Sequence, residues 1–135
     1  MYTYRTYVRM HDTDAAGVIF FANQLQVAHL AFEAFLDSVG LGLGAMIAEK
    51  DYRMPIVHAE TDFKAPIYLG DELTIQLTAK RIGNSSFTLD YRVLNQDGLD
   101  VGSARTIHCA VDRDSWKKRP IPDEIRNALE ENLKP

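Results

Sequence analysis

The stretch DTDAAGVIFFANQLQVAHLAFEAFLDSVG, residues 12–40, decides the fold of this chain. From about Asn23 to Ser38 its apolar residues recur mostly at spacings of three and four, which predicts a helix with an apolar face. That face carries Leu25, Ala28, Phe32, Phe35, Leu36 and Val39. Asn23 is a candidate cap for the exposed start of the helix, and Gly40 is a candidate for its end. Because further apolar side chains lie off the main face, we expect the helix to be buried at the centre of the fold.

Extended segments surround the long helix in the sequence. Residues 3–10 are rich in Tyr, Thr and Val, a composition typical of strands. After the helix comes a short turn or helix, and extended or alternating patterns then predict strands over residues 56–63, 72–81, 86–93 and 101–112. The alternation in the last of these is blurred, as expected of a strand inside a sheet. A short C-terminal helix begins near Pro122 and Asp123.

The expected architecture is α+β, with a single domain over residues 1–135. In it an antiparallel β-sheet wraps around one long central α-helix, and a short helix follows at the C-terminus. Such a sheet leaves strand edges unpaired, and association through those edges is the simplest remedy. We therefore expect at least a homodimer, with a homotetramer as the fuller assembly.

Composition sets bounds on function. The chain has 15 Lys and Arg against 19 Asp and Glu, a formal charge of −4, so it lacks the electrostatic footprint of a nucleic-acid-binding protein. Its one cysteine, Cys109, cannot form an internal disulfide, which favours a reducing compartment, the cytoplasm. Neither a signal peptide nor an apolar run of about 18 residues is visible, so we expect no membrane partner.

The residue types that suggest chemistry gather before the long helix. His11, Asp12 and Asp14 stand directly ahead of a turn that contains Gly17. The first turn of a helix carries unpaired backbone N–H groups and partial positive charge, which together can hold an oxyanion. A nearby carboxylate can then attack an acyl carbon, or deprotonate a water that does. Spacing alone leaves a second interpretation open, in which Asp12 or Asp14 only caps the turn.

The sequence DTDAAGVIFFANQL, residues 12–25, resembles the opening motif of the hotdog-fold acyl-CoA thioesterases of the 4-hydroxybenzoyl-CoA thioesterase type. In that family Asp-x-Asp-x-x-Gly is followed by apolar or aromatic residues and an Asn. The later stretch APIYLGDEL, residues 65–73, resembles the family's turn between its second and third strands. Strand order and length also agree. The resemblance therefore covers essentially the whole chain, and it implies hydrolysis of an acyl-CoA thioester.

The resemblance implies roles for individual residues. Asp14 matches the catalytic carboxylate, which acts as a nucleophile or as a general base towards water. Asp12 matches a supporting position, and Gly17 matches the turn glycine. The backbone N–H near Phe21, at the helix start, matches the group that polarises the thioester carbonyl.

The acyl group is expected to be aromatic. A related branch of the family, which acts on short aliphatic acyl-CoA, carries a His where this chain has Phe21. Phe20 and Phe21 suit a flat ring, unless both side chains only fill the core. The string DTDAAGVIFFAN is similar to that of the dihydroxynaphthoyl-CoA thioesterases of phylloquinone biosynthesis. We therefore expect 1,4-dihydroxy-2-naphthoyl-CoA as the substrate, with 4-hydroxybenzoyl-CoA or short- and medium-chain acyl-CoA as alternatives.

Several further residues are weaker candidates. His58 and Thr61 lie on a strand that is expected to run near the helix start, so they either contact the substrate or are structural. Lys64, Lys80 and Arg81 are the candidates for binding the CoA phosphates. The 4-hydroxybenzoyl-CoA enzyme resembles this chain at the predicted hairpin but has a run of basic residues there. Only Lys80 and Arg81 are basic at that place in this chain.

Neither a metal nor a separate cofactor is expected. His29 and Glu33 lack a second pair of metal ligands, and coenzyme A is part of the substrate. A hydratase of the same fold generally requires a catalytic His at the helix. His11 lies before the turn, which argues against this alternative. A non-catalytic module that binds acyl-CoA or an acyl carrier is the alternative from another class. Replacing Asp14 by Asn separates that module from an enzyme, because only an enzyme loses turnover.

Overall fold

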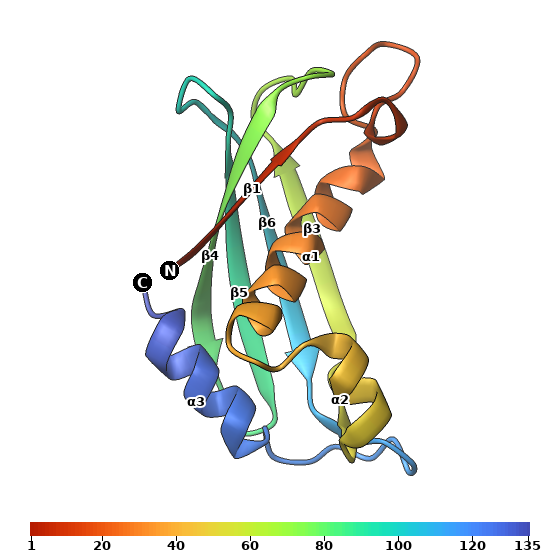
Figure 1. Cartoon of the computed structure of the whole chain (residues 1–135), viewed down its shortest axis with the longest axis vertical. Helices are drawn as coiled ribbons and strands as arrows, with labels where there is room; N and C mark the ends of the chain where they lie inside the picture. The colour runs from red at the N-terminus through yellow and green to blue at the C-terminus, as the bar shows by residue number, and fades with distance from the viewer.

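The computed structural model describes residues 1–135 and has one antiparallel sheet of five strands in the order β1-β4-β5-β6-β3 (Figure 1). These strands are β1 (Tyr2–Tyr7), β3 (Ile56–Phe63), β4 (Glu72–Ile82), β5 (Ser86–Leu94) and β6 (Asp100–Cys109). A second, two-stranded sheet pairs β2 (Tyr52–Arg53) with β7 (Val111–Asp112). The helices are α1 (Phe21–Ser38), α2 (Leu43–Glu49) and α3 (Asp123–Asn132), and a short 3-10 helix covers Met10–Asp12. The predicted α+β architecture is confirmed.

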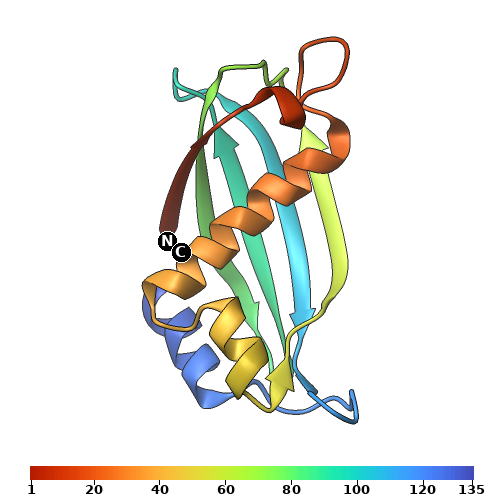
Figure 2. The ribbon, with the colours of Figure 1, turned by 45° about the vertical axis from the view of Figure 1, so that its right-hand side comes forward.

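Helix α1 runs diagonally across one face of the sheet, and α2 and α3 lie at the end of the sheet where α1 ends (Figure 1, Figure 2). Its buried side chains recur at helical spacing and are Gln24, Val27, Ala28, Ala31, Phe32, Phe35 and Leu36. The prediction that the apolar face of the long helix is buried is therefore confirmed, whereas the face away from the sheet, which includes Gln26 and Leu30, is exposed. Taken singly, no helix is long and apolar enough to cross a membrane; α1 and α2 meet that criterion only together, by length and composition, with a bend of 68° between them.

The start of α1 differs from the prediction. The helix begins at Phe21, and Phe20 at the cap position makes no capping bond through its side chain. The prediction that Asn23 caps the helix is wrong, because Asn23 already lies within the first turn. Its Nδ2 instead donates a hydrogen bond to the carbonyl oxygen of Asp12 at 3.0 Å. At the other end the prediction holds, since Gly40 follows the helix with a φ of 77°.

The strands follow the predicted segments with two differences. β1 ends at Tyr7 and not at Met10, because the chain turns into the 3-10 helix before it reaches α1. The last predicted strand is divided in two, since β6 ends at Cys109 and β7 begins at Val111. β6 pairs with β5 on one side and with β3 on the other, so the prediction of an interior strand is confirmed.

A short chain of polar side chains is buried between β5 and β6. The Tyr91 hydroxyl lies 3.2 Å from Thr106 Oγ1, which in turn lies 3.0 Å from His108 Nε2. The His108 ring is 1% exposed and stacks on Phe87 with the ring centroids 4.9 Å apart. This burial lowers the pKa of His108 from 6.5 to about 4. The imidazole is therefore neutral in the folded protein at pH 7.

We expect His108 to make the protein less stable in mild acid. The unfolded chain takes up a proton near pH 6.5 and the folded ring only near pH 4, so stability is full above pH 6.5 and falls as the pH drops between these values. From pH 7 to pH 5 the loss is about 2 kcal/mol. Chemical denaturation of the wild-type and His108→Phe proteins at both pH values measures it. The variant should lose less stability on acidification, and an equal loss in both proteins would contradict the assignment.

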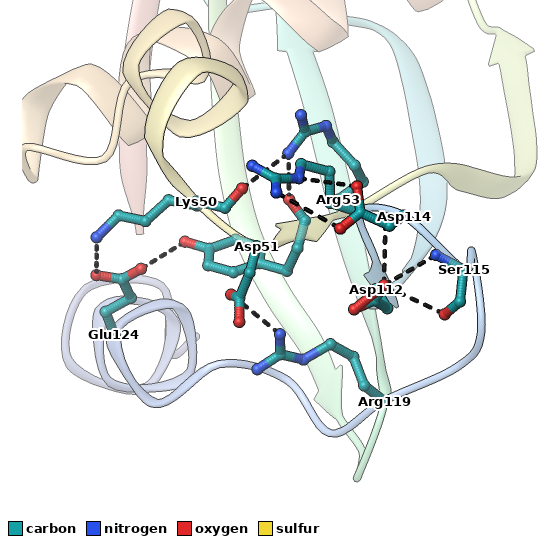
Figure 3. A network of polar contacts seen from close by, with 10 residues as sticks. Lys50, Asp51, Arg53, Asp112, Asp114, Ser115, Arg119 and Glu124 are labelled. Carbon is teal, nitrogen blue, oxygen red and sulfur yellow. Dashed lines mark hydrogen bonds and ion pairs between the residues drawn. The ribbon is translucent and has the colours of Figure 1, made fainter.

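A network of polar contacts joins α2, β2 and α3 at the end of the sheet where α1 ends (Figure 3). The Tyr52 hydroxyl donates to Glu124 Oε1 at 2.6 Å, and Lys50 Nζ donates to Glu124 Oε2 at 3.2 Å. The bond from Tyr52 is the main reason why the pKa of Glu124 lies below its usual range. Arg119 Nη1 donates to Asp51 Oδ1 at 3.1 Å, which joins the segment after β7 to the chain between α2 and β2.

Candidate active site

The motif that precedes α1 folds into a small hairpin, which projects at the upper right of Figure 1. Thr13 and Ile19 form an antiparallel bridge, and the Asp14 N–H donates to the Val18 carbonyl at 3.0 Å. The Gly17 N–H closes the turn by donating to the Asp14 carbonyl at 3.1 Å. Gly17 has a φ of 79°, a conformation that glycine adopts without steric cost. The hairpin therefore presents Asp14 at the beginning of a tight turn.

The carboxylate of Asp14 is exposed and only half engaged. Its Oδ1 accepts a hydrogen bond from the Ala16 N–H at 2.8 Å, whereas its Oδ2 has no donor within the protein. The interpretation in which Asp14 caps the turn thus describes one oxygen. The second oxygen is left free for chemistry, so the two interpretations are compatible.

The start of α1 presents unpaired donors. The Phe20 N–H donates to the Asp12 carbonyl at 2.9 Å, but the N–H groups of Phe21 and Ala22 donate to no group of the protein. Asp12 is thus bonded through its carbonyl to the residue before α1 and through its carboxylate to the chain before it, because its Oδ2 accepts the Arg9 N–H at 2.9 Å. Two amides at the positive end of a helix dipole are thereby free to bind an anion.

Gln24 is a buried residue of this region that the sequence analysis did not single out. It is 1% exposed, and its Nε2 donates to Thr61 Oγ1 at 2.7 Å and to the Asp62 carbonyl at 2.8 Å. A Cβ at Gly102 would lie 2.7 Å from that Nε2, so the approach requires glycine there. Gln24 therefore bonds the first turn of α1 to β3 and packs closely against Gly102 of β6. The available signal was its position four residues before Ala28, in line with the apolar face of the helix.

The predicted substrate-binding residues are distributed along α1 and β3. The rings of Phe20 and Phe21 lie 4.7 Å apart and are 42% and 65% exposed, so the alternative in which both fill the core is wrong. Thr61 uses its hydroxyl structurally, because besides accepting from Gln24 it donates to the Ser103 carbonyl at 2.8 Å. His58 is exposed further along β3, 3.8 Å from Glu60. Contacts of His58 and Thr61 with substrate stay predictions.

The structure does not bring the predicted CoA-binding cations together. Lys64 pairs with Asp100 at 3.3 Å and lines a polar hollow of about 480 Å³ on the sheet face opposite α1. Lys80 and Arg81 lie near the other end of the sheet, at a bulge close to the end of β4, and form no ion pair. Their role in binding CoA stays a prediction.

A second, mostly apolar cleft of about 260 Å³ lies between α1, α2 and the loop after β7. Its walls include Phe32, Met46, Met54, Pro55 and Trp116, together with His29 and His108. His29 lies 3.3 Å from Glu33, and the structure holds no group of three or more His, Cys, Asp or Glu side chains arranged for a metal ion.

The chain is similar to known proteins over nearly its whole length. Residues 8–129 match the model of the thioesterase-like superfamily. The chain is 40% identical over 131 residues to a 1,4-dihydroxy-2-naphthoyl-CoA hydrolase of Nostoc punctiforme, covering 97% of this chain and 88% of the relative. It is 36% identical over 130 residues to the hydrolase of the same name from Synechococcus elongatus, covering 96% and 95%. A crystal structure of a 1,4-dihydroxy-2-naphthoyl-CoA thioesterase from Synechocystis has a TM-score of 0.92 and 34% identity, covering 99% and 98% of the two chains.

Proposed function

The chain belongs to the thioesterase-like superfamily, and on that basis we propose that it hydrolyses 1,4-dihydroxy-2-naphthoyl-CoA to 1,4-dihydroxy-2-naphthoate and coenzyme A. It is a thioester hydrolase with the hotdog fold. One observation carries the choice of substrate. Relatives that are 34% to 40% identical over nearly the full chain are named for the hydrolysis of this ester.

In the proposed reaction Asp14 acts on the thioester carbon or on the attacking water, and the start of α1 acts on the carbonyl oxygen. The free oxygen of Asp14 either attacks the thioester carbon, to give an anhydride that water then hydrolyses, or takes a proton from an attacking water. The N–H groups of Phe21 and Ala22 receive the negative charge that develops on the carbonyl oxygen. When the C–S bond breaks, its electron pair leaves on the CoA sulfur. The unpartnered Asp14 Oδ2 and the unpaired amides support these roles.

The surface around the hairpin supports an aromatic acyl group. Phe20 and Phe21 are exposed there, and Leu69 N–H donates to the Gly17 carbonyl at 3.0 Å, which places a second apolar segment beside the loop. Within that segment Tyr68 is 55% and Leu69 is 49% exposed. Exposed rings next to a reacting group suit a flat substrate, because aromatic side chains contact its face or edge.

The proposal includes a homodimer formed through β3. This strand pairs with β6 on one side only, and all of its residues except Thr61 are exposed, which leaves an unpaired edge. A twofold axis pairs two such edges antiparallel, so the Phe63 end of one copy lies beside the Ile56 end of the other. The first of these ends adjoins Gln24 at the start of α1, and the second follows Pro55 in the apolar cleft. Each hairpin would then lie beside the partner's cleft.

Three further statements belong to the proposal. Two such dimers form a homotetramer. The reaction serves phylloquinone biosynthesis, which rests on the substrate named for the relatives. The protein works in the cytoplasm, which is supported by a chain with a single cysteine.

The proposal is tested by thiol release from a panel of CoA esters. We expect the 1,4-dihydroxy-2-naphthoyl ester to have the highest kcat/KM, by about tenfold or more over the 4-hydroxybenzoyl ester, because the larger ring buries more apolar surface. Short aliphatic esters should be poorer still. A preference for 4-hydroxybenzoyl-CoA or for an aliphatic ester would contradict the proposed assignment of the substrate. Saturable binding of the esters without turnover would show that the protein is a binding module and not an enzyme.

A further inference from the structure

Trp116 occupies an unusual position in the loop that follows β7, next to the labelled Asp114 and Ser115 of Figure 3. Its φ is 60°, and it is the one non-glycine residue of the chain with a positive φ. A bulky side chain adopts this left-handed conformation only when its surroundings impose it. Backbone strain of this kind is concentrated at ligand-binding segments, which makes the loop a candidate.

The loop is held by Asp112. Its Oδ2 accepts hydrogen bonds from the N–H groups of Asp114 at 3.0 Å and Ser115 at 2.9 Å, and these bonds keep the pKa of Asp112 below its usual range. The Trp116 N–H donates to the Asp112 carbonyl at 3.0 Å. The indole nevertheless remains 57% exposed, so packing of the ring does not account for the strained backbone. The loop is a rigid support that presents an aromatic face to solvent.

Two kinds of surface meet at this face. Trp116 forms part of the wall of the apolar cleft described above. Next to it in the chain, Lys117 and Lys118 are exposed and their ammonium groups form no ion pair. The neighbouring Arg113 and Arg119 differ, because they pair with Asp114 and Asp51 at 3.3 Å and 3.1 Å. An exposed aromatic side chain is thus followed in the chain by two exposed lysines that form no ion pair.

We propose that this loop, residues 112–118, binds the 3′-phospho-ADP end of the coenzyme A ester, with the adenine stacked on Trp116 and the phosphates next to Lys117 and Lys118. A purine offers a flat face for stacking, and phosphates take ammonium groups as partners. The proposal rests on the proposed function for the identity of the substrate. In the β3 dimer this loop lies at the end of the sheet that meets the partner's hairpin, so one ester would contact both copies.

The first test uses the fluorescence of Trp116, which is the only tryptophan of the chain. Titration of the wild-type protein with coenzyme A should change the indole emission saturably, and pantetheine, which lacks adenine and phosphates, should not. Raising the salt concentration should weaken the binding of coenzyme A, because the phosphate contacts are screened. An emission unchanged by coenzyme A, or changed equally by pantetheine, would overturn the proposal.

The second test compares two esters in a variant that folds without strain. Trp116→Gly removes the ring and places glycine at a positive φ, so its melting temperature should not fall. Its KM for the naphthoyl-CoA ester should rise about tenfold, while its kcat and its KM for the naphthoyl-pantetheine ester stay unchanged. Trp116→Phe should restore most of the affinity. Equal rises in KM for both esters would show that Trp116 contacts the acyl group or the pantetheine arm, which would overturn the proposal.

The lysines have a matched control. Lys117→Ala/Lys118→Ala should raise the KM for the CoA ester severalfold, and the effect should shrink at high salt. Arg5→Ala/Lys134→Ala removes the same charge from exposed side chains without ion pairs on β1 and at the C-terminus, and should leave the KM unchanged. Equal effects in both double variants would mean that net charge alone matters. If the wild type hydrolyses neither ester, the proposed function fails, and the fluorescence titration still decides whether the loop binds the nucleotide.

Discussion

The Asp14→Asn protein should hydrolyse the naphthoyl-CoA ester with a kcat lowered by a factor on the order of 10³. The structure makes this substitution unusually clean. Asn keeps an oxygen to accept the Ala16 N–H at the Oδ1 position, so the turn that presents the residue is preserved. Only the oxygen that has no donor in the protein is exchanged, for an amide that can neither attack a carbonyl nor accept a proton from water. Binding of the ester should persist, because no binding contact is removed.

Steady-state kinetics, a melting curve and a binding titration on the same preparation measure these three expectations. Asp12→Asn is the matched comparison, because it neutralises a carboxylate of the same loop whose Oδ2 accepts the Arg9 N–H. It should lower kcat far less than Asp14→Asn does. Retention of wild-type turnover by the Asp14 variant would remove this residue from the mechanism, and equal losses in both variants would point to the charge of the loop as a whole.

The elements that could be predicted from the sequence are those whose causes are local. The apolar spacing of residues 23–38 determines which face of α1 is buried, since a helix places every third or fourth residue on one side. The hairpin at Asp14 and Gly17 is also local, because its hydrogen bonds join residues a few positions apart. The wrong prediction for Asn23 also rested on a local signal. Asn23 is a good cap by residue type, but the chain reaches helical geometry earlier, at Phe21, where the Asp12 carbonyl binds the Phe20 N–H.

The features that could not be predicted depend on residues far apart in the chain. The amide of Gln24 donates hydrogen bonds to Thr61 and to Asp62, and only the packing of α1 against β3 brings these residues together. Lys64 and Lys80 were both predicted to bind the CoA phosphates, yet the strand pairing places them near opposite ends of the sheet.

The positive φ of Trp116 depends on bonds to Asp112, and no residue type in that stretch signals it. The sequence therefore indicated the candidate catalytic carboxylate, but not the surfaces that we propose for binding the ester.

The Phe21→Pro protein should lose about 10² to 10³ of kcat, because the substitution deletes one backbone N–H at the proposed oxyanion site. Proline is normally disruptive in a helix, but Phe21 is the first residue of α1 and its N–H donates to no group of the protein. Proline is favoured at that position, and Phe20 before it already has φ −66° and ψ 134°, which a following proline requires. Helix content and melting temperature should therefore stay close to those of the wild type.

Phe21→Ala is the informative companion to this variant, because it removes the ring and keeps the N–H. We expect it to raise the KM for the aromatic ester while lowering kcat much less, since ring contacts are present in the bound ester as well as in the transition state. The two variants thus separate the amide from the side chain at one position. If Phe21→Pro folds normally and turns over the ester as fast as Phe21→Ala, the oxyanion is held elsewhere, and the start of α1 contributes only its surface.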